Sequence, residues 1–172
     1  MKDENIVPFI LGVIHSEGEI YLVILPEGKD APVEFRNEDL FIDFDRIEKK
    51  DICRLWCVNQ PVCRHRNLGE RSGFERSVSF QAAHLSDHEY NEFARTVNNI
   101  NIAFLVPDGK GHLQVVYNPQ RRNKIRIVGT DAEHHIIRAS TQAFPSHYPL
   151  CYLVHSDGTR VEQHEIEQYI ID

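Results

Sequence analysis

The residues best suited to chemistry lie in one segment, Cys53 to Ser79, which reads CRLWCVNQPVCRHRNLGERSGFERSVS. It combines three of the four cysteines of the chain with a histidine and a group of arginines. A guanidinium group stays charged and can donate two parallel hydrogen bonds to a phosphate or a carboxylate. After Val58 the segment shows neither helical nor strand periodicity, and long irregular loops are usually functional. We therefore predict an anion-binding loop here.

Two clusters of basic residues supply the predicted ligand-binding set. One lies in the predicted loop, and the other follows Asn118-Pro119 and continues to Arg126. The predicted ligand-binding residues are Arg64, His65, Arg66, Arg71, Arg76, Arg121, Arg122 and Lys124. Two such clusters on one surface would suit a nucleic-acid backbone or a nucleotide. Alternatively, these arginines pair with the acidic residues of the N-terminal third.

The charge is unevenly distributed along the chain. The formal net charge is −7, which divides into −7 for residues 1–51, +5 for residues 52–126 and −5 for residues 127–172. A basic middle between acidic ends is a possible footprint for a phosphate-bearing partner. If folding instead mixes these segments on one surface, no basic patch forms.

A zinc site is a second hypothesis for the same segment. Cys53, Cys57, Cys63 and His65 follow the pattern C-x3-C-x5-C-x-H, and three cysteines with one histidine are suitable zinc ligands. The spacing matches no common zinc motif. Cys53 and Cys57 would share one face if this part of the chain were helical, and free cysteines are commonly small core residues.

Histidines and carboxylates offer catalytic alternatives. His65 or His84 beside the arginines could act as the proton shuttle of a metal-free phosphoesterase. Asp43 and Asp45, on one face of a strand, could hold magnesium as in a nuclease, although such acids are more often the solvated face of a strand. The pattern His-Ser-acid-Gly occurs at His15 and at His155, which either brings two histidines together or reflects turn chemistry alone.

The elements predicted around these residues define an α+β domain over 1–172, with a mostly antiparallel sheet built from hairpins and two or three short helices packed on it. Alternating apolar residues and turn signals predict strands at 6–14, 19–25, 102–106, 112–117, 124–128 and 150–155. Capping boxes at Ser86/Glu89 and Thr159/Glu162 predict helices over 86–100 and 162–171. Residues 38–58 fit either a strand or a helix.

Composition and the N-terminal residues suggest the compartment. The chain is 41% hydrophobic and 26% charged, which is ordinary for a globular protein. No apolar run approaches the roughly 20 residues that span a bilayer, and Asp3 and Glu4 stand where a signal peptide needs positive charge. We expect a cytoplasmic protein that does not enter membranes, in which cysteines are free thiols or metal ligands.

These observations lead to three functional hypotheses. The first is a binding or regulatory protein that holds an anionic partner, such as nucleic acid, a nucleotide or an acidic protein surface, through arginine-rich loops. The second is a phosphoesterase or nuclease based on histidine and arginine. The third is an acidic protein-interaction or inhibitor subunit that uses its N-terminal third.

Overall fold

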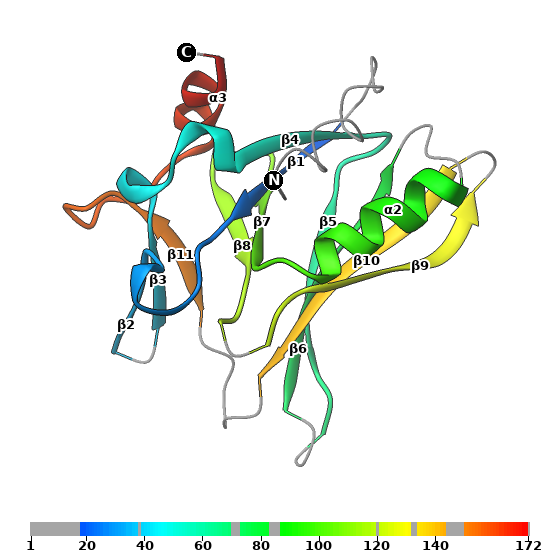
Figure 1. The fold of residues 1–172 in the computed structure, drawn as a ribbon, viewed down its shortest axis with the longest axis horizontal. Helices are drawn as coiled ribbons and strands as arrows, with labels where there is room; N and C mark the ends of the chain where they lie inside the picture. The colour runs from blue at the N-terminus through cyan, green and yellow to red at the C-terminus, as the bar shows by residue number, and fades with distance from the viewer. Residues whose placement is uncertain are drawn as a thin grey trace.

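Strands make up most of the fold (Figure 1). The computed structural model describes residues 18–37, 39–69, 73–82, 87–119, 121–131, 134–143 and 150–171. The strands are β1 (Gly18–Ile24), β2 (Val33–Arg36), β3 (Asp39–Asp43), β4 (Ile52–Cys57), β5 (Val62–Asn67), β6 (Phe74–Ala82), β7 (Ile102–Pro107), β8 (Leu113–Val116), β9 (Lys124–Asp131), β10 (His134–Ala143) and β11 (Cys151–Val154). The described helices are α2 (Asp87–Asn98), α3 (Gln163–Ile171) and short 3-10 helices at Gly28–Asp30, Phe44–Arg46 and Lys49–Asp51.

The described strands form a larger and a smaller sheet. The larger sheet has the order β8-β7-β1-β4-β6-β10-β9, and β5 pairs with β6 outside this path. The smaller sheet has the order β11-β3-β2. All these pairs are antiparallel except β11 with β3. The predicted α+β class with a mostly antiparallel sheet is therefore confirmed.

The central strand β1 lies between two hydrophobic cores. Because successive side chains of a strand point to opposite faces, Ile20 and Leu22 enter one core while Tyr21 and Val23 enter the other. Helix α2 closes the first core, and α3 with the smaller sheet closes the second. Figure 1 shows α2 lying along β9 and β10, with α3 and the smaller sheet on the other side of the molecule.

Several predicted elements are confirmed together with the local chemistry that forms them. The β7–β8 hairpin turns at Asp108-Gly109, where Gly109 adopts φ +83°. One carboxylate oxygen of Asp108 accepts hydrogen bonds from the backbone N–H groups of Lys110 (2.7 Å) and His112 (3.2 Å). These bonds satisfy turn donors that the strands leave unpaired. The strands predicted at 124–128 and 150–155 correspond to β9 and β11.

Both predicted helices are present, but the cap of α3 differs from the prediction. Thr159 does not cap the helix, because its hydroxyl and its N–H both donate to Asp157. In a capping box, a carboxylate in the first turn accepts a hydrogen bond from the backbone N–H of the residue before the helix. Here Glu165 accepts this bond from the N–H of Glu162 at 2.8 Å, whereas the prediction assigned it to Glu162 and Thr159. The predicted cap at Ser86 lies outside the described residues. Neither described helix is long and apolar enough to cross a membrane.

The prediction of an irregular loop after Val58, within the segment 53–79, is wrong. The segment contributes β4, β5 and the first part of β6, and β5 and β6 pair from Val62↔Ser79 to Asn67↔Phe74. The ambiguous residues 38–58 form strands and 3-10 turns and contain no α-helix where the structure describes them. Of the first predicted hairpin, residues 6–14 lie outside the described residues, and residues 19–25 correspond to β1.

The first residue of β1 makes a close backbone approach that leads to a stability prediction. A Cβ atom at Gly18 would lie 2.5 Å from the backbone oxygen of Asn59. We expect Gly18→Ala to lower the free energy of unfolding by about 1–3 kcal/mol, because the neighbouring backbone must move. Urea denaturation measures this, with Gly129→Ala as the control, since its Cβ would meet only Ile136 Cδ1 at 3.6 Å. Equal stability of the two variants would contradict the close approach.

Candidate anion-binding face

Four neighbouring strands, β5, β6, β10 and β9, bring distant basic residues together on one side of the sheet. Directly opposite residues of antiparallel strands have side chains on the same face. Arg64 on β5 is opposite Ser77 on β6, and Ser77 is also opposite Ser140 on β10. Ser140 is in turn opposite Lys124 on β9. These residues therefore form one row across the four strands.

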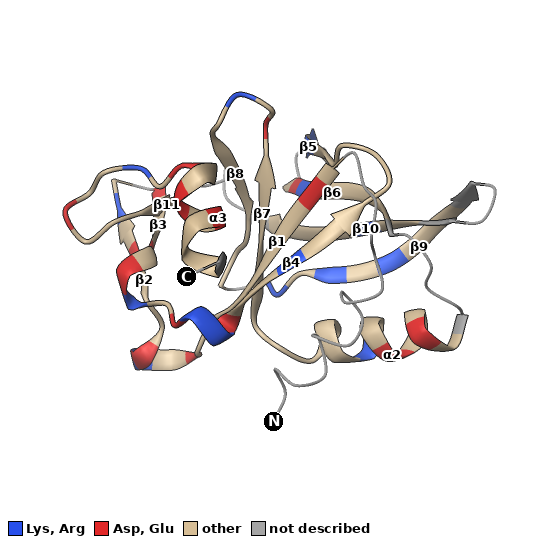
Figure 2. Ribbon diagram, turned by 90° about the horizontal axis from the view of Figure 1, so that it is seen from above, with Lys and Arg blue, Asp and Glu red and all other residues tan. Residues whose placement is uncertain are grey.

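We call this side of the four strands the basic face. Its polar residues include Arg64, Arg66, Glu75, Ser77, Ser79, Lys124, Arg126, Arg138, Ser140 and Gln142, and the exposed Val62 lies on the same side, opposite Ser79. Five of these residues are cations and one is an acid. Figure 2 shows the basic positions along β9 beside β10, whereas acidic and basic residues are mixed over the smaller sheet and the 3-10 helices.

The opposite side of the same strands belongs to the hydrophobic core. Val78, Ala139 and Ile125 alternate with the residues of the basic face, and all three are buried in the core that includes Phe93 of α2. Helix α2 thus covers the apolar side, and Figure 2 shows it on one side of β9 and β10. Since Arg64 and Arg126 are exposed, the basic face is accessible to a partner.

The basic face holds a pair of like charges. Arg126 and Arg138 are directly opposite each other on β9 and β10. Neither forms an ion pair with a carboxylate among the described residues, and the Nε of Arg138 is buried without a hydrogen-bond partner there. Like charges at directly opposite positions are destabilising. An anion bound between these strands would relieve the repulsion.

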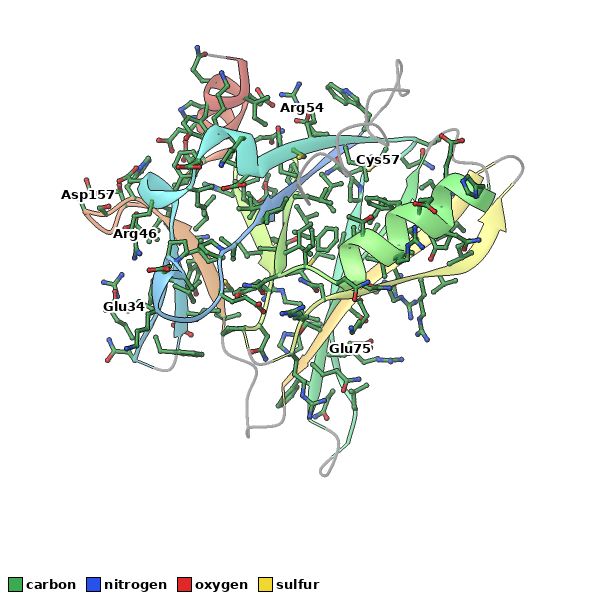
Figure 3. The ribbon with its side chains drawn as sticks, in the orientation of Figure 1. Glu34, Arg46, Arg54, Cys57, Glu75 and Asp157 are labelled. Carbon is green, nitrogen blue, oxygen red and sulfur yellow. The ribbon has the colours of Figure 1, made fainter. Side chains whose placement is uncertain are left out.

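One arginine of the basic face is already neutralised. Glu75, only 7% exposed, accepts a hydrogen bond from Arg66 at 3.0 Å. Figure 3 labels Glu75 on the part of β6 that pairs with β5, far from Cys57 on β4. The pair fixes the edge strand β5 to β6. Arg66 therefore has a structural role, in contrast to Arg64.

A pocket opens where the chain entering β9 separates from β10. Its volume is about 470 Å³, and it is lined by Arg121, Arg122, Lys124, Ser140, Thr141 and Gln142. The Thr141 hydroxyl donates to the backbone oxygen of Arg121 at 2.6 Å, which holds the two segments side by side. Arg122 is paired with Glu27 and also donates to the backbone oxygen of Asn99 at 3.3 Å. The second predicted basic cluster therefore meets the basic face at this pocket.

The other predicted ligand residues are placed differently. His65 and Arg76 are directly opposite each other, on the side of the strands away from Arg64. The His65 ring packs edge-on against Phe74 at 5.5 Å, and burial together with the charge of Arg76 lowers the pKa of His65. Arg71 and His84 lie outside the described residues. His65 thus does not stand beside Arg64 as a proton shuttle.

The predicted zinc ligands are not assembled into a metal site. Cys53 and Cys57 lie on a strand rather than a helix, and both are buried in the core that α2 closes, with Cys63 packed against it. Burial, followed by the charge of Glu19, raises the pKa of the Cys57 thiol, which opposes the thiolate that zinc requires. Within the described part of the chain, which includes His65, no group of three or more His, Cys, Asp and Glu side chains is placed to hold a metal ion.

Most of the acidic residues that the structure describes in the N-terminal third are engaged within the fold. Glu34 and Glu48 pair with neighbouring bases, Glu19 pairs with Arg54, and Glu27 pairs with Arg122. Among the members of the predicted basic clusters, Arg122 thus has an ion pair that reaches this third of the chain. The alternative that these acids neutralise the predicted arginines is not supported for Arg64 or Arg126.

A separate polar network surrounds His155. Its Nδ1 lies 2.8 Å from Asp45 and its Nε2 lies 2.6 Å from Glu165. The Ser156 hydroxyl lies 3.0 Å from both carboxylate oxygens of Asp43, and the Ser156 N–H donates to Asp45 at 2.8 Å. The two predicted magnesium ligands are thus used to hold the turn after β11. His15, the other histidine of the repeated pattern, lies outside the described residues.

Sequence reasoning missed several residues of the basic face. Arg138, Ser77, Ser140 and Gln142 were not predicted, although Arg138, Ser140 and Gln142 alternate with buried residues along β10. That alternation was the available signal for a strand at this position. The position of Arg138 beside Arg126 depends on strand pairing, which the sequence alone does not reveal.

The chain was compared with protein-family models, curated proteins and solved structures, and none of them matches it. Its function must therefore be inferred from the basic face and the residues around it.

Proposed function

We propose that this protein is a small binding protein that holds nucleic acid by its phosphate backbone on the basic face. The opposed Arg126–Arg138 pair carries this proposal. Two opposed cations without an ion pair among the described residues lower the stability of the fold, and such costs are expected at functional sites. Ser79 and Ser140 lie between the two lines of cations and are half-buried, so their hydroxyls can donate to phosphate oxygens. The ligand is held on strands, not on the arginine-rich loops that the sequence suggested.

The spacing of the cations favours a repeating anion. Arg64 and Arg66 on β5, and Lys124 and Arg126 on β9, are each two residues apart on one face, which corresponds to about 6.7 Å along a strand. The line of cations on β5 and the line of cations on β9 are three strand spacings apart, about 14 Å. A single small anion would leave most of this surface unused. A phosphodiester chain presents charges at regular intervals and can contact both lines.

The contacts would be independent of base sequence. The basic face contains no aromatic side chain among its described residues, so it lacks the stacking platform that single-strand binders use for bases. Contacts to phosphate position a nucleic acid without reading it. The four cysteines are free thiols, which suits the reducing cytoplasm that we propose as the compartment.

Binding of a fluorescein-labelled oligonucleotide, followed by fluorescence anisotropy, tests the proposal. If Arg64, Lys124, Arg126 and Arg138, the cations of the basic face without an ion pair among the described residues, contact phosphates of a single strand, the logarithm of the affinity should fall with the logarithm of salt concentration with a slope of about −2.8. Two oligonucleotides of different base sequence should bind equally. Absence of binding at about 50 mM salt, or tighter binding of a polyglutamate peptide, would overturn the proposal.

The like-charge pair also leads to a stability prediction. We expect Arg126→Ala to raise the free energy of unfolding by about 0.2–1 kcal/mol, because the repulsion with Arg138 is removed and Arg126 has no described ion pair. The same variant should bind the oligonucleotide more weakly. Arg126→Lys keeps the charge and is the control in urea denaturation. A destabilised Arg126→Ala variant would mean that Arg126 supports the fold.

A further inference from the structure

We infer that the pocket between the start of β9 and β10 binds the terminal phosphomonoester of the nucleic-acid strand held on the basic face. This inference rests on the proposed function and adds a site for the strand end. The pocket shares Lys124 and Ser140 with the row that crosses to Arg64. A strand lying along this row therefore has one end at the pocket.

The charges around the pocket suit a strand end better than an internal phosphate. An internal phosphodiester carries one negative charge, whereas a terminal phosphomonoester carries about 1.5 to 2. On β5 and β9 the cations are spaced singly along each strand. At the pocket, Arg121, Arg122 and Lys124 come together within four residues of the chain, and Glu27 offsets the charge of Arg122, so two cations remain in excess. The more highly charged group is therefore expected where the cations converge.

The residues of the pocket have two roles. Some form hydrogen bonds within the protein that hold the pocket walls, and others can bind a ligand. Arg122 is fixed by Glu27 and by the backbone oxygen of Asn99, and the Thr141 hydroxyl is used by the backbone of Arg121. Among the described residues, Lys124 makes one long contact, of 3.4 Å, with the backbone oxygen of Asn98. Its ammonium group can turn to a phosphate at little cost, with Ser140 and Gln142 as further donors.

The size of the pocket is consistent with more than a phosphate group. Its volume of about 470 Å³ falls in the range of small-molecule sites, roughly 300–1,000 Å³. The terminal sugar and its phosphate can enter together, while the next nucleotide continues past Ser140 toward Arg64. The pocket thus holds one end of the nucleic-acid strand, which then crosses the sheet from β9 toward β5.

Matched oligonucleotides that differ only at their ends test this inference. Labelled strands of one sequence carry a phosphate at the 5′ end, a phosphate at the 3′ end or hydroxyl groups at both ends. We expect one of the two phosphorylated strands to bind about tenfold more tightly than the unphosphorylated strand, the value of one charge-assisted contact. Lys124→Gln should remove this preference. Arg64→Ala, which changes the far end of the row, should weaken all three strands and keep the preference.

Each outcome of this experiment has a defined meaning. Equal binding of all three strands would overturn the pocket assignment and leave the proposed function standing, whereas failure of every strand to bind would overturn the proposed function itself. A nucleoside monophosphate that competes as strongly as the phosphorylated strand would show a free-nucleotide site and overturn the strand-end assignment. Retention of the preference in Lys124→Gln would place the end of the strand elsewhere. The melting temperature of Lys124→Gln, measured in parallel, should equal that of the wild type.

Discussion

The double variant Arg64→Ala/Arg126→Ala should bind an oligonucleotide about 10- to 100-fold more weakly than the wild type at low salt, without loss of stability. Both side chains are exposed on the basic face, and neither has an ion pair among the described residues. Each removed cation should also reduce the steepness of the salt dependence by about 0.7. Anisotropy titrations between about 50 and 200 mM salt measure both quantities.

A matched control separates the basic face from the net charge of the protein. Arg36→Ala/Arg95→Ala removes the same two charges from β2 and from α2, where both side chains are exposed and lie outside the basic face. This control should keep both the affinity and the salt slope of the wild type. If the two double variants weaken binding equally, the attraction comes from overall charge and the basic face has no special role. If neither weakens binding, the ligand is held elsewhere.

The elements governed by local chemistry could be predicted from the sequence. Asp108-Gly109 specifies its turn through its own hydrogen bonds and a positive φ, and Ile125 alternates with Arg126 as half-buried strands require. The basic face could not be predicted in the same way. Arg64 and Lys124 are 60 residues apart and share a row only through two intervening strands. Pairing of distant strands leaves no local pattern in the sequence.

β5 was not predicted and β4 fell in the ambiguous segment 38–58, for opposite physical reasons. Among the described strands β5 pairs with β6 alone, and Arg64, His65 and Arg66 on both of its faces are exposed, so no apolar side creates a period of two. β4 lies between two cores, with Cys53 and Leu55 in one core and Ile52 in the other, while Arg54 and Trp56 beside Ile52 are half-buried. A strand buried on both faces reads as a continuous apolar run, which resembles a buried helix.

His155→Ala should destabilise the protein most strongly in mildly acidic solution. Both ring nitrogens of His155 contact carboxylate oxygens, and only the doubly protonated ring can donate to both. Through these contacts His155 joins the 3-10 helix at Phe44–Arg46 to α3. Its loss would leave Asp45 and Glu165 facing a space without a donor. We expect a cost of about 1–2 kcal/mol, given that the His155 side chain is 25% exposed and its ion pairs are partly screened.

The pH dependence follows from the directions of the three pKa shifts. The hydrogen bonds to Asp45 and then Glu165 raise the pKa of His155 above 6.5, so its stabilisation is complete below that value and is lost as pH rises through the folded pKa. The Ser156 N–H and His155 lower the pKa of Asp45 below 3.8. For Glu165, burial acts upward, but the Glu162 N–H and His155 outweigh it and lower the pKa below 4.5. The carboxylate contributions are therefore present above these values and are lost as pH falls through the folded pKa values.

The difference in stability between wild type and His155→Ala should thus be largest between about pH 4.5 and 6.5 and should shrink at alkaline pH. Urea denaturation across this range measures it, and hydrogen exchange of the α3 amides locates the loosened contact. His112→Ala is the control, because His112 is 61% exposed and its nearest carboxylate, on Glu162, is 4.0 Å away. Asp45→Asn/Glu165→Gln should flatten the same pH dependence, since a neutral pair no longer favours the imidazolium. A pH-independent effect of His155→Ala would show that the ring acts by packing against Phe44 and not by its charge.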